Sequence, residues 1–260
     1  MGARTLRITL VQSPIHWENP AKNRFFFSEI IAPLANTTDL IVLPEMFTTG
    51  FSMNAEELSE PQDGPTVKWL VKTSKSVNAA ITGTVIIKEN NNFYNRLFFV
   101  TPEGNIHTYN KKHTFTLAGE DAVFTSGTTR IIIDYLGFKI CPFICYDLRF
   151  PVWARNTDGY DLLLYTANWP EKRIAAWDVL LKARAIENMS YCVGVNRVGV
   201  DGNNHSYVGH SAIYDCLGKQ VSREEFESAF VETVTVYKDH IDATRVQLQF
   251  LNDADKFTLT

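Results

Sequence analysis

The sequence has neither a long apolar run nor a long basic run. No window approaches 18 consecutive apolar residues, so a transmembrane helix is not expected. No run of Lys and Arg reaches five residues, and the formal net charge of −4 also argues against nucleic acid as the main partner. The first segment, MGARTLRITLVQS, lacks the apolar core of a secretory signal. These absences predict a soluble, cytoplasmic protein.

Cysteine is scarce, and the spacings that hold structural metals are missing. There is no CxxC pair among the four cysteines and no HxxxH pair among the six histidines. A structural zinc site is therefore not expected. A reducing cytosol also argues against disulfides. The cysteines to be explained are Cys141, Cys145, Cys192 and Cys216.

What remains is an ordinary globular composition. Of the 260 residues, 45% are hydrophobic and 21% are charged, which is enough for a sizeable core. No linker rich in Pro, Gly or Ser divides the chain, and it has no low-complexity tract or exact repeat. We therefore expect one domain over residues 1–260 rather than two.

Short apolar segments alternate between the strand period and the helix period. The pattern predicts strands at residues 6–11, 39–43, 79–87, 93–100, 130–135, 138–144, 161–165, 191–195, 210–214 and 229–236. It predicts helices at residues 20–34, 66–77, 150–156 and 172–189. The turn-forming residues 89–92 and 136–137 indicate two hairpins. This alternation is typical of an α/β protein with mixed sheets.

Three of the short apolar strands end at residues that are suited to chemistry. IVLPE ends at Glu45, FKICPFIC ends at Cys145, and LLLYTANWP ends near Asn168 and Trp169. Ligands of open α/β sheets gather at the carboxyl ends of strands. If these strands run parallel, we expect their three ends to meet on one edge.

Cys145 alone allows several interpretations. Free cysteine is among the most buried residue types, so a structural role is the ordinary expectation. The strand-then-helix pattern around FICYDLRFP favours a nucleophile instead, because a helix N-terminus stabilises a thiolate. The backbone N–H groups that follow, beginning with Tyr146, could then hold an oxyanion.

A cysteine nucleophile usually needs a base, and the sequence offers three candidates. His107 and His113 could each pair with the thiol, although a lone histidine is more often a surface or hydrogen-bonded group. Glu45 competes with them, because a carboxylate directly after IVLP would be poorly solvated and suited to proton transfer. Its other interpretation is a helix or turn cap. The residues alone leave this choice open.

The segment YNKKHTF carries Lys111 and Lys112 between aromatic residues. One interpretation is a solvated basic loop, since surface lysines are common. The other is an ammonium group beside a carbonyl oxygen, where it stabilises developing negative charge. The following AGEDAVFTSG places Glu120 before a glycine-bearing turn, which alone indicates little.

Taken together, LPEMF, YNKKHTF and ICYDLRFP resemble the three motifs of the nitrilase superfamily of carbon–nitrogen hydrolases. The resemblance implies a Glu–Lys–Cys triad of Glu45, Lys111 and Cys145. The lysine of this family follows Tyr-X, which selects Lys111 over Lys112. Glu120 matches the auxiliary glutamate that orients the lysine and the attacking water.

A longer resemblance covers essentially the whole chain. AGEDAVFTSG, CYDLRFPVWARN, LYTANWP and KARAIENMSYCVGVNRVGVDGN look like bacterial omega-amidases, which hydrolyse 2-oxoglutaramate and 2-oxosuccinamate. The implied fold is a four-layer α-β-β-α sandwich that commonly forms homodimers through helices including the one after the cysteine. The implied reaction passes through a cysteine thioester, with Tyr146 lending its backbone N–H to the oxyanion. No cofactor is expected, because cysteine supplies the nucleophile and lysine the positive charge.

A substrate of that branch carries a carboxylate and a keto group several atoms from the amide. Arg173 is the predicted carboxylate ligand, because a guanidinium can pair with a carboxylate through two hydrogen bonds. Arg149 is a second candidate, which could instead hold Asp147 or a dimer contact.

Phe51, Trp169 and Asn168 are expected to line the pocket, although the two aromatic residues would be equally ordinary in a core. The alternatives within the superfamily are an amidase for deaminated glutathione or for N-carbamoyl compounds, and a nitrilase. An alternative of another class is a catalytically silent binding module, because fold does not imply function.

Overall fold

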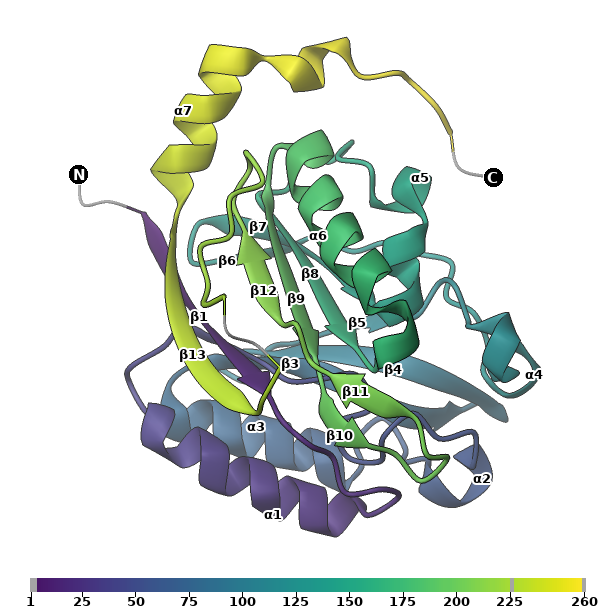
Figure 1. Cartoon of the computed structure of the whole chain (residues 1–260). Helices are drawn as coiled ribbons and strands as arrows, with labels where there is room; N and C mark the ends of the chain where they lie inside the picture. Colours follow the sequence, from purple (N-terminus) through teal and green to yellow (C-terminus); the bar gives the residue numbers. More distant parts are fainter. Residues whose placement is uncertain (1–3, 225–226, 259–260) are drawn as a thin grey trace.

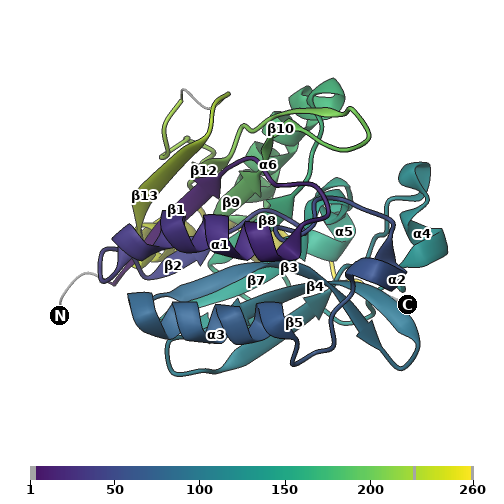
Figure 2. The same ribbon diagram turned by 90° about the horizontal axis from the view of Figure 1, so that it is seen from below.

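The computed structural model describes residues 4–224 and 227–258. Two β-sheets pack face to face at its centre, and helices cover the outer face of each sheet (Figure 1; Figure 2). The layers therefore run helix, sheet, sheet, helix. This arrangement confirms the predicted four-layer α/β sandwich with mixed sheets.

The first sheet joins the N-terminal part of the chain to its last strand. Its strands lie in the order β13 (Phe230–Tyr237), β1 (Thr5–Gln12), β2 (Leu40–Val42), β3 (Ala80–Glu89), β4 (Asn92–Val100) and β5 (Ile106–Asn110). The central pairs β1–β2 and β2–β3 are parallel, and the other pairs are antiparallel. The predicted hairpin at residues 89–92 is the turn between β3 and β4.

The second sheet has the same mixed character. Its strands lie in the order β12 (Ala212–Tyr214), β9 (Tyr191–Asn196), β8 (Leu162–Ala167), β7 (Phe138–Ile144) and β6 (Ile133–Tyr135). Strands β7, β8 and β9 are parallel, and β6–β7 forms the second predicted hairpin. A separate hairpin consists of β10 (Val198–Val200) and β11 (Ser206–Val208).

The two-residue period of the strands explains how the layers separate. On β2, Leu40 and Val42 enter the core between the two sheets, whereas Ile41 joins the core beneath the helices. Strand β4 repeats the pattern, with Leu97 facing the other sheet and Phe98 facing the helices. Because successive side chains point to opposite faces, one strand serves both cores.

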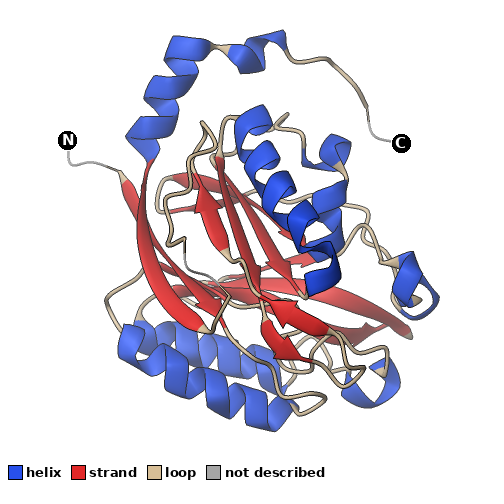
Figure 3. Cartoon of the chain, in the orientation of Figure 1, coloured by secondary structure: helices blue, strands red, loops and turns tan. Residues whose placement is uncertain are grey.

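Helices shield both sheets from solvent (Figure 3). On the first sheet lie α1 (Pro20–Ile31) and α3 (Pro65–Val77), and on the second α5 (Pro151–Ala154) and α6 (Ile174–Asn188). Short helices α2 (Ala55–Leu58) and α4 (Glu120–Val123) flank the site, and α7 (Lys238–Leu248) follows β13. Proline at the first helical position, as in α1, α3 and α5, costs no backbone hydrogen bond there.

Several elements differ from the sequence-based prediction. Strands β5, β10 and β11 and helices α2, α4 and α7 were not predicted. The strand predicted at residues 130–135 is reduced to Ile133–Tyr135, and the helix predicted at 150–156 is reduced to Pro151–Ala154. The proline at position 151 explains the late start, because the residue before a proline avoids helical backbone angles.

Candidate active site

The three chemically suited strand ends converge, but across two sheets. Strands β7 and β8 are parallel neighbours that lead to Cys145 and Asn168, whereas β2, which leads to Glu45, belongs to the other sheet. The expectation that all three ends share one edge of a sheet is therefore wrong. They meet because the two sheets pack face to face, so that a loop from one sheet reaches the strand ends of the other.

Cys145 lies at a sharp bend between β7 and a five-residue 3-10 helix, Cys145–Arg149. Its φ of +43° is in the left-handed region, which is uncommon for a residue with a side chain. This bend places the sulfur at the wall of the cavity, and 8% of the residue is exposed. The Sγ atom lies 3.8 Å from the backbone oxygen of Asn168.

The electrostatic surroundings of this thiol are the reverse of those predicted from the sequence. Burial raises the pKa of Cys145 well above its ordinary value, and the carboxylate of Glu45 raises it further, although Lys111 opposes both. The short 3-10 helix provides no long helix dipole. The surroundings of Cys145 therefore disfavour the thiolate, and the predicted stabilisation by a helix dipole is not supported.

A buried charge cluster lies next to the thiol. The Nζ atom of Lys111 is 2.9 Å from Glu45 Oε1, 3.0 Å from Glu120 Oε1 and 2.9 Å from Glu120 Oε2. All three side chains are at most 1% exposed. The three N–H groups of one ammonium are thus divided between two carboxylates.

The cluster shifts the proton affinity of its members. Burial alone would lower the pKa of Lys111, but the carboxylates of Glu120 and Glu45 outweigh it and raise the pKa above its ordinary value. Burial raises the pKa of Glu120, and Glu45 adds to the rise while Lys111 opposes it. The two carboxylates therefore favour the charged form of Lys111, which is suited to holding negative charge.

The backbone around Lys111 fixes where this cation lies. Lys111 directly follows β5, and its backbone N–H donates to the Asn95 oxygen on β4 at 3.0 Å. Its own backbone oxygen accepts from Gly127 at 2.7 Å. A Cβ atom at Gly127 would lie 2.1 Å from the Asn110 oxygen, so only glycine allows the segment to pack this closely against the lysine loop.

Glu45 is held from a second direction by Asn168. The backbone N–H of Asn168 donates to Glu45 Oε2 at 2.8 Å, and its side-chain amide donates to the Glu45 backbone oxygen at 2.6 Å. Glu45 is therefore not a helix or turn cap, since its carboxylate faces the lysine and the end of β8. Asn168 lines the cavity as predicted, but its side-chain N–H is directed at Glu45.

The two candidate histidines do not contact the thiol in the part of the chain that the structure describes. His113 Nδ1 is 2.8 Å from Asp147 Oδ1, and its ring stacks on Phe150 at a centroid distance of 3.7 Å. The ring of His107 on β5 packs edge-on against Phe99. Both histidine alternatives are thus left without geometric support, and Glu45 stays the candidate base.

Asp147 joins the lysine loop to the cysteine bend. Its Oδ1 accepts the backbone N–H of His113 at 2.9 Å, and its Oδ2 accepts the Tyr109 hydroxyl at 2.8 Å and the Ile144 backbone N–H at 3.1 Å. The carboxylate is fully buried. Within the described residues Arg149 makes no hydrogen bond or ion pair with Asp147, so this alternative for Arg149 has no support.

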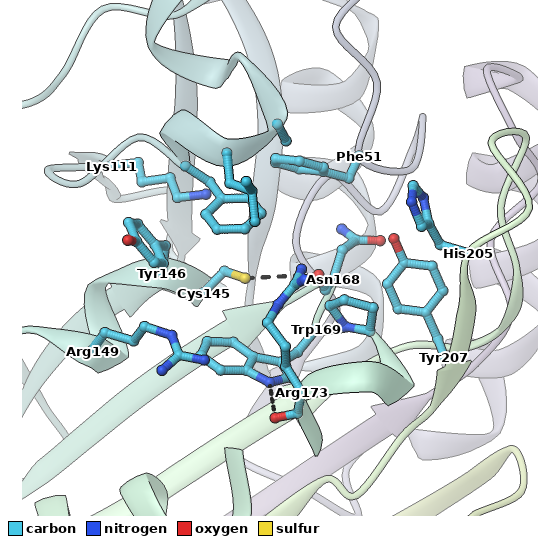
Figure 4. Close-up of a pocket in the computed structure, with 14 residues that line it drawn as sticks. Phe51, Lys111, Cys145, Tyr146, Arg149, Asn168, Trp169, Arg173, His205 and Tyr207 are labelled. Carbon is cyan, nitrogen blue, oxygen red and sulfur yellow. Dashed lines mark hydrogen bonds between the residues drawn. The ribbon is translucent and has the colours of Figure 1, made fainter. Parts of the chain in front are cut away.

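A cavity of about 210 Å³ opens in front of Cys145 (Figure 4). Its wall combines aromatic rings with cations, as small-molecule sites commonly do. The lining residues are Phe51, Lys111, Phe115, Leu117, Ala118, Cys145, Tyr146, Arg149, Asn168, Trp169, Pro170, Arg173, His205 and Tyr207. The predicted lining residues thus come together here, whereas Glu45 and Glu120 lie behind Lys111.

Comparison with known proteins agrees with this geometry. The family model for carbon–nitrogen hydrolases matches residues 7–246. The chain belongs to the carbon–nitrogen hydrolase family. It is 42% identical to the omega-amidase YafV of Yersinia enterocolitica, over 98% of this chain and 99% of that protein. It is 33% identical to the 2-oxoglutaramate amidase of Bacillus subtilis, over 86% and 88% of the two chains.

A solved structure is similar over the same length. It is that of a carbon–nitrogen hydrolase superfamily protein from Xanthomonas campestris that carries an arsenic adduct in its active site. The two chains are 41% identical and superpose with a TM-score of 0.96, over 98% of this chain and 99% of the other. This likeness confirms the predicted fold class of this carbon–nitrogen hydrolase.

Two guanidinium groups face the cavity of this carbon–nitrogen hydrolase without a carboxylate partner among the described residues. Arg149 lies over the ring of Trp169 at 5.0 Å, and Arg173 lies over the ring of Phe115 at 4.9 Å. The Trp169 indole N–H donates to the Arg173 backbone oxygen at 2.8 Å (Figure 4). The ring that Arg149 covers is thus hydrogen-bonded to the backbone of Arg173. Lys111 is neutralised by glutamates, so these arginines give the cavity its excess positive charge.

Some residues of the site were missed from the sequence. Tyr207 and His205 enter from the β10–β11 hairpin, which was not predicted. Phe115 is the last residue of the lysine motif YNKKHTF but carried no signal of its own. Asn95 lies within β4, where an asparagine interrupts an apolar strand; that interruption was the available signal, because asparagine is depleted in strands.

The described ranges contain no helix long and apolar enough to cross a membrane. They also contain no group of three or more His, Cys, Asp or Glu side chains that could hold a metal ion. The four cysteines are free and buried.

Proposed function

We propose that this carbon–nitrogen hydrolase cleaves the terminal amide of a small ω-amido 2-oxo acid, such as 2-oxoglutaramate or 2-oxosuccinamate, to the acid and ammonia. The observation that carries the proposal is the Glu45–Lys111–Cys145 cluster beside a cavity with two cations that lack a carboxylate partner. The omega-amidase and 2-oxoglutaramate amidase relatives support the choice of substrate.

The first half of the reaction forms a thioester. Glu45 takes the thiol proton of Cys145, and the sulfur bonds to the amide carbon while the carbonyl electron pair moves onto oxygen. Lys111 and the backbone N–H of Tyr146 hold the resulting oxyanion. When the carbon–nitrogen bond breaks, Glu45 returns its proton to nitrogen, and ammonia leaves.

The second half of the reaction releases the acid. Glu45 takes a proton from water, and the oxygen of that water bonds to the thioester carbon. Glu120 keeps Lys111 oriented toward the second oxyanion from behind the cavity. The carbon–sulfur bond then breaks, and the leaving sulfur recovers its proton from Glu45. The cycle uses neither a metal ion nor an organic cofactor.

The far end of the substrate would lie among Arg173, Arg149, Phe51 and Trp169. A carboxylate placed there would gain an ion pair that the protein does not itself satisfy, because neither arginine has a carboxylate partner in the described residues. Arg173 is the proposed carboxylate ligand. The aromatic walls would exclude water from the carbon chain of the substrate.

Replacing Arg173 with Ala should raise the KM for 2-oxoglutaramate about tenfold or more, because charge-assisted hydrogen bonds contribute ~1.5–3 kcal/mol. Hydrolysis of a monoamide of similar length without the carboxylate should not change. The matched control is Lys172→Ala, which removes an exposed cation one residue away. An unchanged KM for 2-oxoglutaramate in Arg173→Ala would remove this arginine from the substrate site.

A panel of substrates tests the function itself. Ammonia release should be fastest with ω-amides of 2-oxo dicarboxylates and slower with deaminated glutathione, N-carbamoyl amino acids and nitriles. A preference for one of the latter would replace the proposal by another activity of the superfamily. Folded protein that releases no ammonia from any of them would favour the silent binding module.

We also propose one folding unit, a homodimer and a cytoplasmic location. A single core cluster that draws residues from both sheets supports the folding unit. Apolar side chains exposed on α5 and α6 support the dimer, namely Val152, Val179 and Ile186. The cytoplasmic location rests on the likeness to bacterial omega-amidases.

A further inference from the structure

A buried asparagine touches all three charged members of the cluster. Asn95 is 1% exposed and lies on β4 opposite Ile86 of β3. Its Nδ2 atom is 2.7 Å from Glu45 Oε1 and 3.2 Å from Glu120 Oε1. Its backbone oxygen accepts the Lys111 N–H at 3.0 Å. No motif of the sequence drew attention to it.

The asparagine amide and the lysine ammonium bridge the same two carboxylate oxygens. Glu45 Oε1 and Glu120 Oε1 each accept from both Lys111 Nζ and Asn95 Nδ2. One bridge is cationic and belongs to a flexible side chain. The other is neutral and belongs to a short side chain on strand β4. A primary amide suits this place, because its single nitrogen carries two N–H groups.

Lys111 cannot serve an oxyanion without releasing one of its present partners. Its three N–H groups face three carboxylate oxygens, one on Glu45 and two on Glu120. Turning one N–H toward the substrate would uncover a buried carboxylate oxygen, which is costly in an apolar surrounding. Asn95 already donates to Glu120 Oε1, so that oxygen keeps a donor when the lysine turns.

The Oδ1 atom of Asn95 takes no part in these hydrogen bonds. It is buried and has no hydrogen-bond partner among the described residues. The two N–H groups of the amide are used for the glutamates, and the oxygen is left without a donor.

We propose that Asn95 is a positioning residue that holds Glu45 and Glu120 as hydrogen-bond acceptors while Lys111 turns to the reaction oxyanion. The inference rests on the proposed function, because it assigns Lys111 and Glu45 their roles in it. The titratable groups that face this amide are Glu45, Glu120 and Lys111, with Cys145 beyond them. Arg96, the next residue on β4, is directed away and bonds to Asn110 Oδ1.

The test is Asn95→Leu, which keeps the approximate shape and removes both donors. Loss of a donor to a carboxylate favours its protonated form, so the acid limb of kcat/KM should move up by about one pH unit. The kcat should fall at least tenfold while KM changes less than threefold, because the substrate does not touch Asn95. The melting temperature should change little, because Lys111 still donates to both carboxylate oxygens and the unpartnered Oδ1 atom is removed.

The matched control is Asn188→Leu, another buried asparagine, whose amide donates to the Arg184 backbone oxygen on α6 and makes no hydrogen bond to Glu45, Glu120 or Lys111. It should lower the melting temperature and leave the acid limb in place. Asn95→Asp supplies a second variant of unchanged shape in case Asn95→Leu does not fold. A third carboxylate in the cluster should move the acid limb up further and lower kcat more.

A measurement without substrate separates this inference from the proposed function. Alkylation of Cys145 by iodoacetamide, followed against pH, requires Glu45 to be ionised but no amide to be hydrolysed. Its acid limb should move up in both Asn95 variants. If the acid limbs of the pH profiles for turnover and for alkylation both stay where they are in the parent protein, Asn95 does not position the two glutamates. If alkylation shifts although no ω-amide is hydrolysed, the inference stands and the substrate proposal fails.

Discussion

At the scale of single residues, the site contains three buried carboxylates that are stabilised by different partners. Glu45 and Glu120 share one ammonium, whereas Asp147 accepts only from neutral or backbone donors and from His113. The resemblance of three motifs predicted that Glu45, Lys111 and Cys145 act together, whereas the contacts of Asn95 and Asp147 were not predicted. These contacts depend on how strand β4, the lysine loop and the cysteine bend meet in space, which a one-dimensional pattern does not encode.

Asp147→Asn should impair both stability and turnover. Each oxygen of this carboxylate takes part in two hydrogen bonds, whereas an amide has only one acceptor oxygen. Two buried donors would lose their acceptor, which costs about 1–3 kcal/mol each. The kcat should fall because the loop of Lys111 and the bend of Cys145 lose their shared anchor.

The measurement is a denaturant titration together with steady-state kinetics. Asp121→Asn, the same change at an exposed position on the neighbouring helix α4, should alter neither quantity. Parent-like stability in Asp147→Asn would show that the four contacts of this carboxylate are not important to the fold.

At the scale of elements, the central strands were predictable and the peripheral elements were not. Strands β1 to β4 and β7 to β9 are buried and strongly apolar, so their period is clear in the sequence. The edge strand β5, IHTYN, is half polar and largely exposed. Helix α7, KDHIDATRVQL, is polar overall and buries only Ile241 and Thr244, so it offers few apolar residues from which a helix could be predicted.

The pairing of β1 with β2 contains an ion pair with a defined pH dependence. Asp39 accepts the backbone N–H of Arg7 at 2.7 Å and its guanidinium at 2.7 and 3.1 Å. Burial opposes ionisation here, but the hydrogen bonds from Arg7 outweigh it and lower the pKa of Asp39. A carboxyl group with a lowered pKa stabilises the fold above its unfolded pKa, and this stability is lost as pH falls through the folded pKa.

Asp39→Asn should therefore lower the melting temperature at pH 7, and the difference from the parent protein should shrink toward pH 3. Each kcal/mol corresponds to a shift of ~2–4 °C for a domain of this size. Asp239→Asn is the control, because its pair with Arg4 is exposed and such pairs contribute little. A difference that grows as the pH falls would contradict the sign of this argument.

At the scale of the whole molecule, two sheets form one core, and the site lies where the ends of both sheets meet. This packing explains why residues from opposite halves of the sequence form one cluster. The sequence predicted the layers through the resemblance, but the strand order across the two sheets came only from the structure. Helices α5 and α6 leave the apolar side chains of Val152, Val179 and Ile186 exposed.

The proposed dimer makes Val179, which is 67% exposed on α6, an interface residue. Val179→Asp should convert a species of twice the chain mass to the monomer, because it would bury an unpaired charge. Light scattering coupled to size exclusion measures this directly. Val231→Asp, at an exposed valine on β13, should leave the mass unchanged. A Val179→Asp protein that keeps the mass of the parent would exclude α6 from the interface.

The central claim is that Cys145 carries the acyl group of an amide substrate. The most direct measurement is the intact mass of the protein quenched in acid during turnover of 2-oxoglutaramate, with parallel detection of ammonia. The account predicts an added acyl mass on Cys145 and steady ammonia release, both absent in a folded Cys145→Ala variant. Ammonia release by Cys145→Ala at the rate of the parent protein would contradict it.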